Sequence, residues 1–378
     1  MDGAGKIQSG VLAFLAVLGT FGFQTAAVAQ ADYTEEFLSP PGAYPANHSA
    51  TLAELPGKKL MACWYAGAYE GASDTQIYCR TQNLGSPIWN EDLTVAVARH
   101  EATHGNFLFN DTIGNPVLYR DDDDRLYLFY AVRMFGGWTL SELAFKVSED
   151  LGKTWSHGKI LDTLFSRRWG GRLPRALPIR IDRGQILLPL YYDLVPRAGY
   201  TCLIDLISAT KKEVRKVKCM NIPGNGHLQP TLVEVGGRVF AYLRSSNDAH
   251  KIESASIDFQ VHQMLDPAGW TKEPDLELDN PNSSVAATST SDGRVLLVYN
   301  SVLGGRNILS LAISTNGKKF EHVFDFDKRP ESSWEFSYPT IFRDSNGVFQ
   351  LVYTWGGRAA IKHVSFTEAW LNQQKPIN

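Results

Sequence analysis

The chain has 378 residues, of which 44% are hydrophobic and 20% are charged, so it is long enough to bury a sizeable core in one large domain or two ordinary ones. Its formal net charge of -3 creates no strong field of either sign. We therefore expect neither nucleic acid nor an anionic membrane surface among its partners.

The N-terminus has the pattern of a secretory signal peptide over residues 1–29. Lys6 precedes an apolar run at residues 11–23 that is too short to span a bilayer comfortably, and Ala27-Val28-Ala29 fits an A-x-A cleavage site. An uncleaved membrane anchor is the alternative. We expect residues 30–378 to form a single domain of a secreted or periplasmic protein that is a monomer and has no membrane contact after cleavage.

After residue 45, short apolar stretches rich in β-branched and aromatic residues alternate with turn sequences. Examples are KLMACWYA (59–66), RLYLFYAV (125–132), QILLPLYYD (185–193) and FQLVYTW (349–355). This pattern predicts an all-β protein of many hairpins, with a helical period only in the last dozen residues. The acidic run from Asp121 to Asp124 is predicted to be a hairpin turn rather than a calcium site, because no EF-hand spacing follows it.

Four cysteines lie in two strand-like pairs. Cys63 and Cys79 are separated by a polar turn that contains glycine, and Cys202 and Cys219 flank a similar hairpin. Because an exported protein enters an oxidising compartment, we expect two cross-hairpin disulfides, with four buried free thiols as the alternative. No C-x-x-C sequence is present, which argues against structural zinc.

The sequence RHEATHGN (99–106) fits the H-E-x-x-H pattern of zinc proteases, in which His100 and His104 would bind the metal. That pattern requires a helix, because only there do residues i and i+4 share a face. The preceding DLTVAVAR has a β-branched, alternating pattern, and Gly105 follows the second histidine at once. We therefore expect a loop here and neither a metal nor a cofactor.

A turn motif recurs along the chain. Its best copy runs from Ser148 to Trp155 as S-E-D-L-G-K-T-W, and less regular copies begin at Ser314 and Thr81, with a partial fourth candidate at Ser256. In each copy an apolar strand enters a polar turn whose short side chains can bind the turn's own backbone. The copies recur at roughly 60-residue spacing, about one four-stranded blade each, which favours about six propeller blades over a pair of β-sandwiches.

S-x-D-x-G-x-T-W is the Asp-box of sialidases, so the chain resembles the sialidase (neuraminidase) superfamily of six-bladed β-propellers. It is most similar to the bacterial branch of predicted neuraminidases with BNR repeats. The sequences that carry this resemblance are TIGNPVLY (112–119), ILLPLYYD (186–193), NGHLQPTLVE (225–234), NPNS (280–283) and SYPTI (337–341). They are spread over nearly the whole predicted mature chain.

The resemblance implies a site for an acidic sugar. Sialidases hold the carboxylate of sialic acid with three arginines, since a guanidinium can pair with a carboxylate through two hydrogen bonds. The second and third match Arg244 and Arg306. His48 stands where the first is expected, and Thr354 stands where the family has the glutamate that supports it. The missing arginine and its missing support are mutually consistent.

The resemblance also implies catalytic residues. Tyr338 matches the nucleophilic tyrosine, but Gln229 replaces the glutamate that activates it. Glu70 and Asp74 both fall in the loop that carries the acid/base carboxylate, and spacing alone does not choose between them. His48 is a further catalytic candidate, because histidine titrates near neutral pH. The weaker candidates for substrate binding, besides Gln229, are Arg175, Tyr191 and His227.

These residues leave three functions open. The first is an exo-glycosidase of sialidase type that cleaves a terminal acidic sugar from a glycan. The second is a lyase or rhamnosidase-like enzyme at glucuronate-containing polysaccharide, in which arginine neutralises a uronate while His48 and Tyr338 move protons. The third is a glycan-binding propeller without catalysis.

Overall fold

The computed structural model shows the predicted succession of short strands. The structure describes Met1 and residues 31–98, 110–134, 137–162, 172–195, 197–207, 213–224, 226–258 and 269–377. The predicted signal peptide and the H-E-x-x-H sequence lie outside these residues. Within them, no helix is both long enough and apolar enough to cross a membrane.

The described strands form six antiparallel sheets that follow one another in chain order. The first sheet contains β2 (Ala46–Leu55), β3 (Lys59–Gly67), β4 (Gln76–Asn83) and β5 (Thr94–Val97). The second contains β6 (Asn110–Arg120), β7 (Leu126–Met134), β8 (Gly137–Ser148) and β9 (Lys159–Asp162). The third contains β10 (Leu173–Pro174), β11 (Ile179–Asp182), β12 (Gln185–Tyr192), β13 (Ala198–Asp205) and β14 (Arg215–Asn221).

The remaining sheets repeat the same order. The fourth contains β15 (His227–Val235), β16 (Arg238–Ser245), β17 (Glu253–Asp258) and β18 (Thr271–Glu273). The fifth contains β19 (Ala286–Ser289), β20 (Val295–Tyr299), β21 (Ile308–Ser314) and β22 (Glu321–Lys328). The sixth contains β23 (Ser337–Arg343), β24 (Phe349–Trp355), β25 (Ala360–Phe366) and β1 (Tyr33–Ser39), and a short helix α1 (Glu368–Leu371) follows it.

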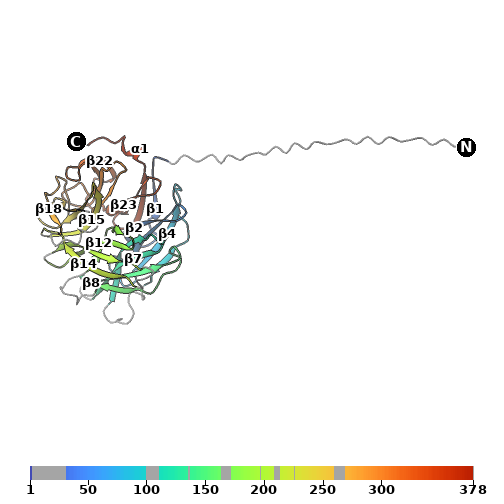
Figure 1. Cartoon of the computed structure of the whole chain (residues 1–378). Helices are drawn as coiled ribbons and strands as arrows, with labels where there is room; N and C mark the ends of the chain where they lie inside the picture. Colours follow the sequence, from blue (N-terminus) through green and yellow to red (C-terminus); the bar gives the residue numbers. More distant parts are fainter. Residues whose placement is uncertain are drawn as a thin grey trace. The chain divides into compact units, whose positions relative to one another are not determined.

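The sheets are arranged as a closed ring. The first strand of each sheet contacts the first strands of its neighbours, with β2 beside both β6 and β23, and the sequence colours in Figure 1 pass around the sheets in chain order. The N-terminal β1 pairs with β25, so both ends of the described chain build the sixth sheet. The fold is therefore the predicted six-bladed β-propeller.

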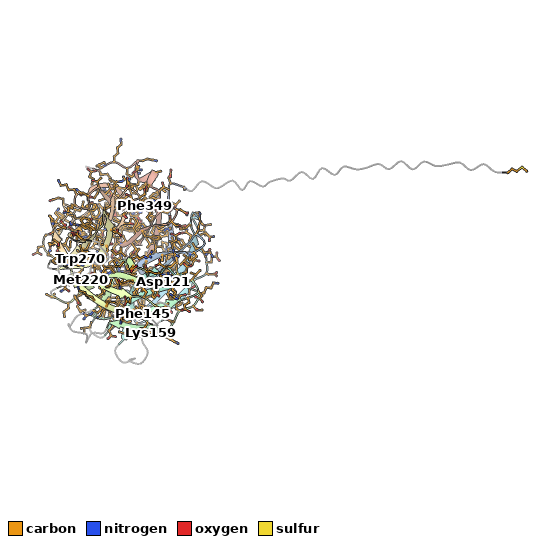
Figure 2. The ribbon with its side chains drawn as sticks, viewed as in Figure 1. Asp121, Phe145, Lys159, Met220, Trp270 and Phe349 are labelled. Atoms are coloured by element: carbon orange, nitrogen blue, oxygen red, sulfur yellow. A yellow bond between two sulfur atoms is a disulfide. The ribbon has the colours of Figure 1, made fainter. Side chains whose placement is uncertain are left out.

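Among the described residues, six apolar layers lie between neighbouring sheets, and a smaller seventh cluster of Ala131, Leu173, Tyr191 and Leu228 joins the second, third and fourth sheets. One layer joins β24 and β25 to β2 and β3 and so closes the ring. Figure 2 marks Phe145, Trp270 and Phe349, which belong to three different layers. Burial of both faces of each sheet explains why β3, β7 and β12 are apolar almost throughout rather than alternating.

The turn motif behaves as predicted in its best copy. The Ser148 hydroxyl accepts a hydrogen bond from the Gly152 amide at 2.8 Å, and the Asp150 carboxylate accepts bonds from the amide and hydroxyl of Thr154 at 2.8 and 2.6 Å. These bonds lower the pKa of Asp150 to about 2, beginning with the Thr154 hydroxyl. The motif connects the third and fourth strands of its sheet, so it stabilises a hairpin.

The other predicted local features also form. Cys63 is bonded to Cys79 and Cys202 to Cys219, each pair directly opposite across neighbouring strands. The acidic run is a hairpin turn between β6 and β7, in which the Asp121 carboxylate accepts hydrogen bonds from two backbone amides of the turn. Both outcomes agree with the sequence prediction.

Replacing Cys63 and Cys79 together by alanine should lower the free energy of unfolding by about 3 kcal/mol, because a bond across about 16 residues restricts the unfolded chain. Urea denaturation under oxidising conditions measures the change. The Cys202→Ala, Cys219→Ala pair provides a matched comparison, since its loop is nearly as long. An unchanged urea midpoint for both double variants would contradict this account.

Candidate functional site

The first strands of the sheets share a backbone irregularity. Residues with left-handed φ values of 50–54° interrupt the strand register in four sheets: Ser49, Asn115, Gln229 and Tyr338. Asn282, with φ of 59°, lies just before the first strand of a fifth sheet, and Arg175 separates β10 from β11 in the remaining one. Such bulges change the direction of the side chains next to them. They occur at corresponding positions of the first strands.

Threonines join these bulges to neighbouring sheets. Thr51, Thr231 and Thr340 each lie two residues beyond a left-handed residue, and each makes a hydrogen bond to the backbone of another first strand. The bonds are Leu118 N–H to Thr51 Oγ1 at 3.0 Å, Ala287 N–H to Thr231 Oγ1 at 3.1 Å and Thr340 Oγ1–H to Ala50 O at 2.8 Å. They fix the sheets relative to one another where the side chains converge.

Several predicted site residues meet around Tyr338, in a group that we call the Tyr338 cluster. Its members are His48, Tyr65, Glu70, Arg175, Tyr191, Gln229, Arg244, Asn282, Arg306, Glu335, Tyr338, Thr354 and Arg358, linked by the contacts described below.

At the centre of the cluster, two donors face the phenol oxygen of Tyr338. Arg244 Nη1 donates at 3.3 Å and Gln229 Nε2 at 3.4 Å. Gln229 also accepts from Arg244 at 3.2 Å and donates to the Tyr191 hydroxyl at 3.2 Å. An amide in place of a carboxylate therefore contacts Tyr338 as a donor, not as a proton acceptor.

Arg244 and Arg306 are held by one residue. Asn282 accepts from Arg244 Nε through its side chain at 2.6 Å and from Arg306 Nη2 through its backbone carbonyl at 3.1 Å. Arg306 also pairs with Glu335 at 2.9 Å and lies 5.8 Å from the Tyr338 ring centre. Asn282 thus holds two guanidinium groups that both lie next to Tyr338.

Glu335 stays ionised beside these cations. Burial opposes its charge, but the hydrogen bond from Ser337 and the charges of Arg306 and Arg358 outweigh burial and lower its pKa. The Glu335 carboxylate is thus ion-paired with Arg306 and further stabilised by the charge of Arg358.

His48, the member of the cluster that lies on β2, is 1% exposed. Its Nδ1 is 3.0 Å from the Thr354 hydroxyl, so two of the three positions that depart from the sialidase pattern contact each other. Its ring centre is 4.3 Å from that of Tyr338, and its Nε2 is buried without a partner. Burial first, then the charges of four arginines led by Arg358, hold its pKa well below the usual value, so His48 is neutral.

Arg175 and Tyr191 form the rest of the buried side. Arg175 is 2% exposed, donates to the Thr340 hydroxyl and the Pro339 carbonyl, and lies 5.0 Å from the Tyr338 ring centre. Burial lowers its pKa to about 10, which leaves it cationic at neutral pH. Tyr191 accepts from Asn115 at 3.2 Å, and burial raises its pKa.

The two acid/base candidates occupy different places. Glu70 pairs with Arg358 at 2.6 Å and accepts from the Tyr65 hydroxyl at 3.4 Å, which brings it into the cluster. Asp74 accepts from the Ala68 amide at 3.1 Å and so closes the turn of its own loop. The geometry therefore favours Glu70 where spacing did not decide.

His227 lies away from these contacts although it is fully buried. Its Nδ1 accepts from the Gly199 amide at 3.0 Å, and its neighbourhood includes Gly224 and Glu253. Burial, followed by the charge of Lys272, lowers its pKa to about 4. The packing thus places it beside the third sheet rather than next to Tyr338.

Sequence reasoning missed Arg358 and Tyr65. Arg244 ends the second strand of its sheet, and Arg306 lies in the connection that follows the second strand of the next one. Arg358 follows β24 and Tyr65 lies near the end of β3, which are the equivalent places in two other sheets. A polar side chain at or just after the end of a second strand is therefore a sequence signal that could have identified Arg358 and Tyr65.

The described residues contain no group of three or more histidine, cysteine, aspartate or glutamate side chains placed to hold a metal ion. Both carboxylates of the Tyr338 cluster are instead paired with arginines.

Comparison with known proteins agrees with this architecture. The model of the BNR repeat-like domain family matches residues 58–351, and the chain belongs to that family. No curated protein matches the chain.

Solved sialidase structures share the fold. The Hadza microbial sialidase Hz136 has a TM-score of 0.67 at 14% identity, covering 88% of this chain and 68% of its own. The intramolecular trans-sialidase from Ruminococcus gnavus, in complex with oseltamivir carboxylate, has a TM-score of 0.66 at 13% identity, with 87% and 96% covered. The NanB sialidase from Streptococcus pneumoniae has a TM-score of 0.67 at 11% identity, with 90% and 71% covered. At these identities the likeness establishes the fold alone.

Acid should destabilise the protein partly through His227. Because its pKa is about 4 in the fold and 6.5 when unperturbed, the unfolded chain takes up the proton first. The resulting stability is present above pH 6.5 and is lost as the pH falls toward 4, by up to about 3 kcal/mol.

Urea denaturation from pH 7.5 to 4.5 measures this slope in the wild type and in His227→Gln. The difference between the two isolates the histidine from neighbours that also titrate, such as Glu253, whose pKa burial raises. Parallel curves for the two proteins would show that His227 carries no such linkage.

Proposed function

We propose that the protein is an exported glycosidase of sialidase type that cleaves a terminal acidic sugar from a glycan. The observation that carries this proposal is the charge balance of the Tyr338 cluster. Its four arginines are faced by two carboxylates, Glu70 and Glu335, and His48 is neutral. The excess of positive charge favours an anionic ligand, because it is only partly screened by solvent.

The exposed side of the cluster is suited to a carboxylate. Arg244 and Arg306 are partly exposed and held side by side by Asn282, whereas His48, Arg175 and Gln229 are buried beneath them. Two fixed guanidinium groups can bind one carboxylate with both charge and geometry. A terminal sialic acid presents such a group directly on its glycosidic carbon, whereas a terminal uronate carries it on C5, across the ring oxygen from that carbon.

In this mechanism Tyr338 attacks the glycosidic carbon and forms a covalent sugar–enzyme intermediate, while Glu70 protonates the departing oxygen. Glu70 must carry a proton for this step and then removes one from the water that releases the sugar. Gln229 and Arg244 both donate to the Tyr338 oxygen, so neither accepts the phenol proton, and in this mechanism the partly exposed phenol gives its proton to a solvent water molecule as it attacks.

A second candidate function is elimination at a uronate. Gln229 supports it, since an amide cannot take the proton of a nucleophilic tyrosine as the family's glutamate does. Here the arginines neutralise the uronate carboxylate, His48 or Tyr338 removes the C5 proton, and a neighbouring group protonates the leaving oxygen, which creates a C4–C5 double bond. His48 is neutral and its Nε2 has no hydrogen-bond partner, but burial and the arginine charges that lower its pKa oppose the uptake of a proton by the ring.

Two assays separate these functions. Release of a fluorophore from a sialoside or glucuronide reports hydrolysis, and growth of the unsaturated-uronate absorbance on glucuronate-containing oligosaccharides reports elimination. We expect hydrolysis, lost almost entirely in Tyr338→Phe and reduced about 100-fold in kcat/KM by Arg244→Met, since bonds to charged groups contribute up to about 3 kcal/mol.

Arg238→Met is the matched control, because this arginine begins the same strand and pairs with Asp258. It should keep full activity. Unsaturated product would select elimination instead, and glycan binding with neither product would leave a propeller without catalysis.

A further inference from the structure

The turn that carries Arg358 has an unusual backbone. Gly356, Gly357 and Arg358 have consecutive φ values of 64, 67 and 77°, all left-handed. Glycine adopts such values freely, whereas a residue with a side chain is strained at 77°. A strained arginine therefore needs its surroundings to hold it in place.

Two backbone hydrogen bonds supply that support. The Asn47 amide donates to the Arg358 carbonyl at 2.8 Å, and the Gly357 amide donates to the Glu335 carbonyl at 3.0 Å. Asn47 precedes His48 on β2, and Glu335 pairs with Arg306. The turn is therefore fixed directly to the strand of His48 and to the segment that holds Arg306.

The Arg358 guanidinium lies among the charged members of the cluster. Its Nη2 is 2.6 Å from Glu70 Oε2, and its side chain is 31% exposed. Its Nε is buried without a hydrogen-bond partner, although a buried donor normally has one. Glu335, Tyr65 and Tyr338 are near enough to interact with its charge. Arg358 thus has one strong partner and one unused donor.

Arg358 supplies positive charge close to His48. At the position of His48 an arginine is absent, and the neutral His48–Thr354 pair occupies its place. Among the four arginines, Arg358 acts most strongly on His48 by charge. The guanidinium of Arg358 therefore supplies positive charge near His48 from the turn after β24, in the sixth sheet. The sequence motifs did not identify this turn.

We propose that Arg358 is a third anion-binding arginine, and that Glu70 occupies it in the free protein as a stand-in for the carboxylate of the substrate. This inference rests on the proposed acidic-sugar function and deepens it. An incoming carboxylate replaces Glu70 at Arg358 and uses its unpaired Nε. Displaced Glu70 is then free of its ion pair and can act at the leaving oxygen, as the proposed mechanism requires.

Isothermal titration calorimetry tests the competition without requiring turnover. The probes are N-acetylneuraminic acid and D-glucuronic acid, each compared with its methyl ester. Arg358→Met should weaken binding of the acid about 10-fold or more, and Arg358→Lys should recover part of that loss. Glu70→Gln should bind the acid several-fold more tightly than the wild type, because it removes the competitor.

Arg238→Met and Arg244→Met complete the set. The first should bind as the wild type does, and the second should lose affinity. Unchanged binding in Arg358→Met, or a loss in Glu70→Gln equal to that in Arg358→Met, would show that the Glu70–Arg358 pair is only structural and would overturn this inference. If the wild type binds neither acid more tightly than its ester, the proposed function fails together with it.

Discussion

The site depends on a kink that is repeated around the ring. In a regular first strand, successive side chains would point alternately into the two apolar layers on either side of the sheet. No side chain would then point toward the Tyr338 cluster. Ser49, Asn115, Gln229 and Tyr338 break the strand register with left-handed backbone, and the threonines beyond two of the same bulges bind the next sheet. One local distortion therefore both joins the sheets and brings the polar side chains together.

The second constraint is electrostatic. Burying arginine is unfavourable unless its donors are satisfied. Arg175 meets this requirement only in part: its two terminal nitrogens donate to a hydroxyl and a carbonyl and its guanidinium lies over the ring of Tyr338, but its Nε is buried without a partner. Glu335 neutralises Arg306 and Glu70 neutralises Arg358, which leaves positive charge beneath and beside Tyr338. Burial first, and then the same positive charge, lowers the pKa of His48, so the arginines that favour an anion also help to keep the histidine neutral.

Much of the fold was predictable because its signals are local. Turn chemistry, the Asp-box and the strand composition each follow from a few neighbouring residues, and the cysteine pairs lie within single hairpins. Closure by β1 was not predicted, since strand pairing across more than 300 residues leaves no local pattern. The short helix at the C-terminus did agree with the helical period noted there.

The site was only partly predictable. Arg244, Arg306, Tyr338 and Gln229 were found from motifs, and the structure brings them together. Glu70 could not be separated from Asp74, because the two differ in partners from distant strands and not in spacing. The place of Arg358 in the site is set by a left-handed turn between two strands, which no motif indicates. His227 is the opposite case, because it lies in a matched motif but its side chain packs away from Tyr338.

The most direct test of the central claim is a crystal structure of the protein with N-acetylneuraminic acid or D-glucuronic acid bound. The account predicts that the sugar carboxylate lies within hydrogen-bond distance of the guanidinium groups of both Arg244 and Arg306, on the exposed side of Tyr338. A sugar bound with its carboxylate turned away from both arginines, or bound outside the Tyr338 cluster, would contradict it.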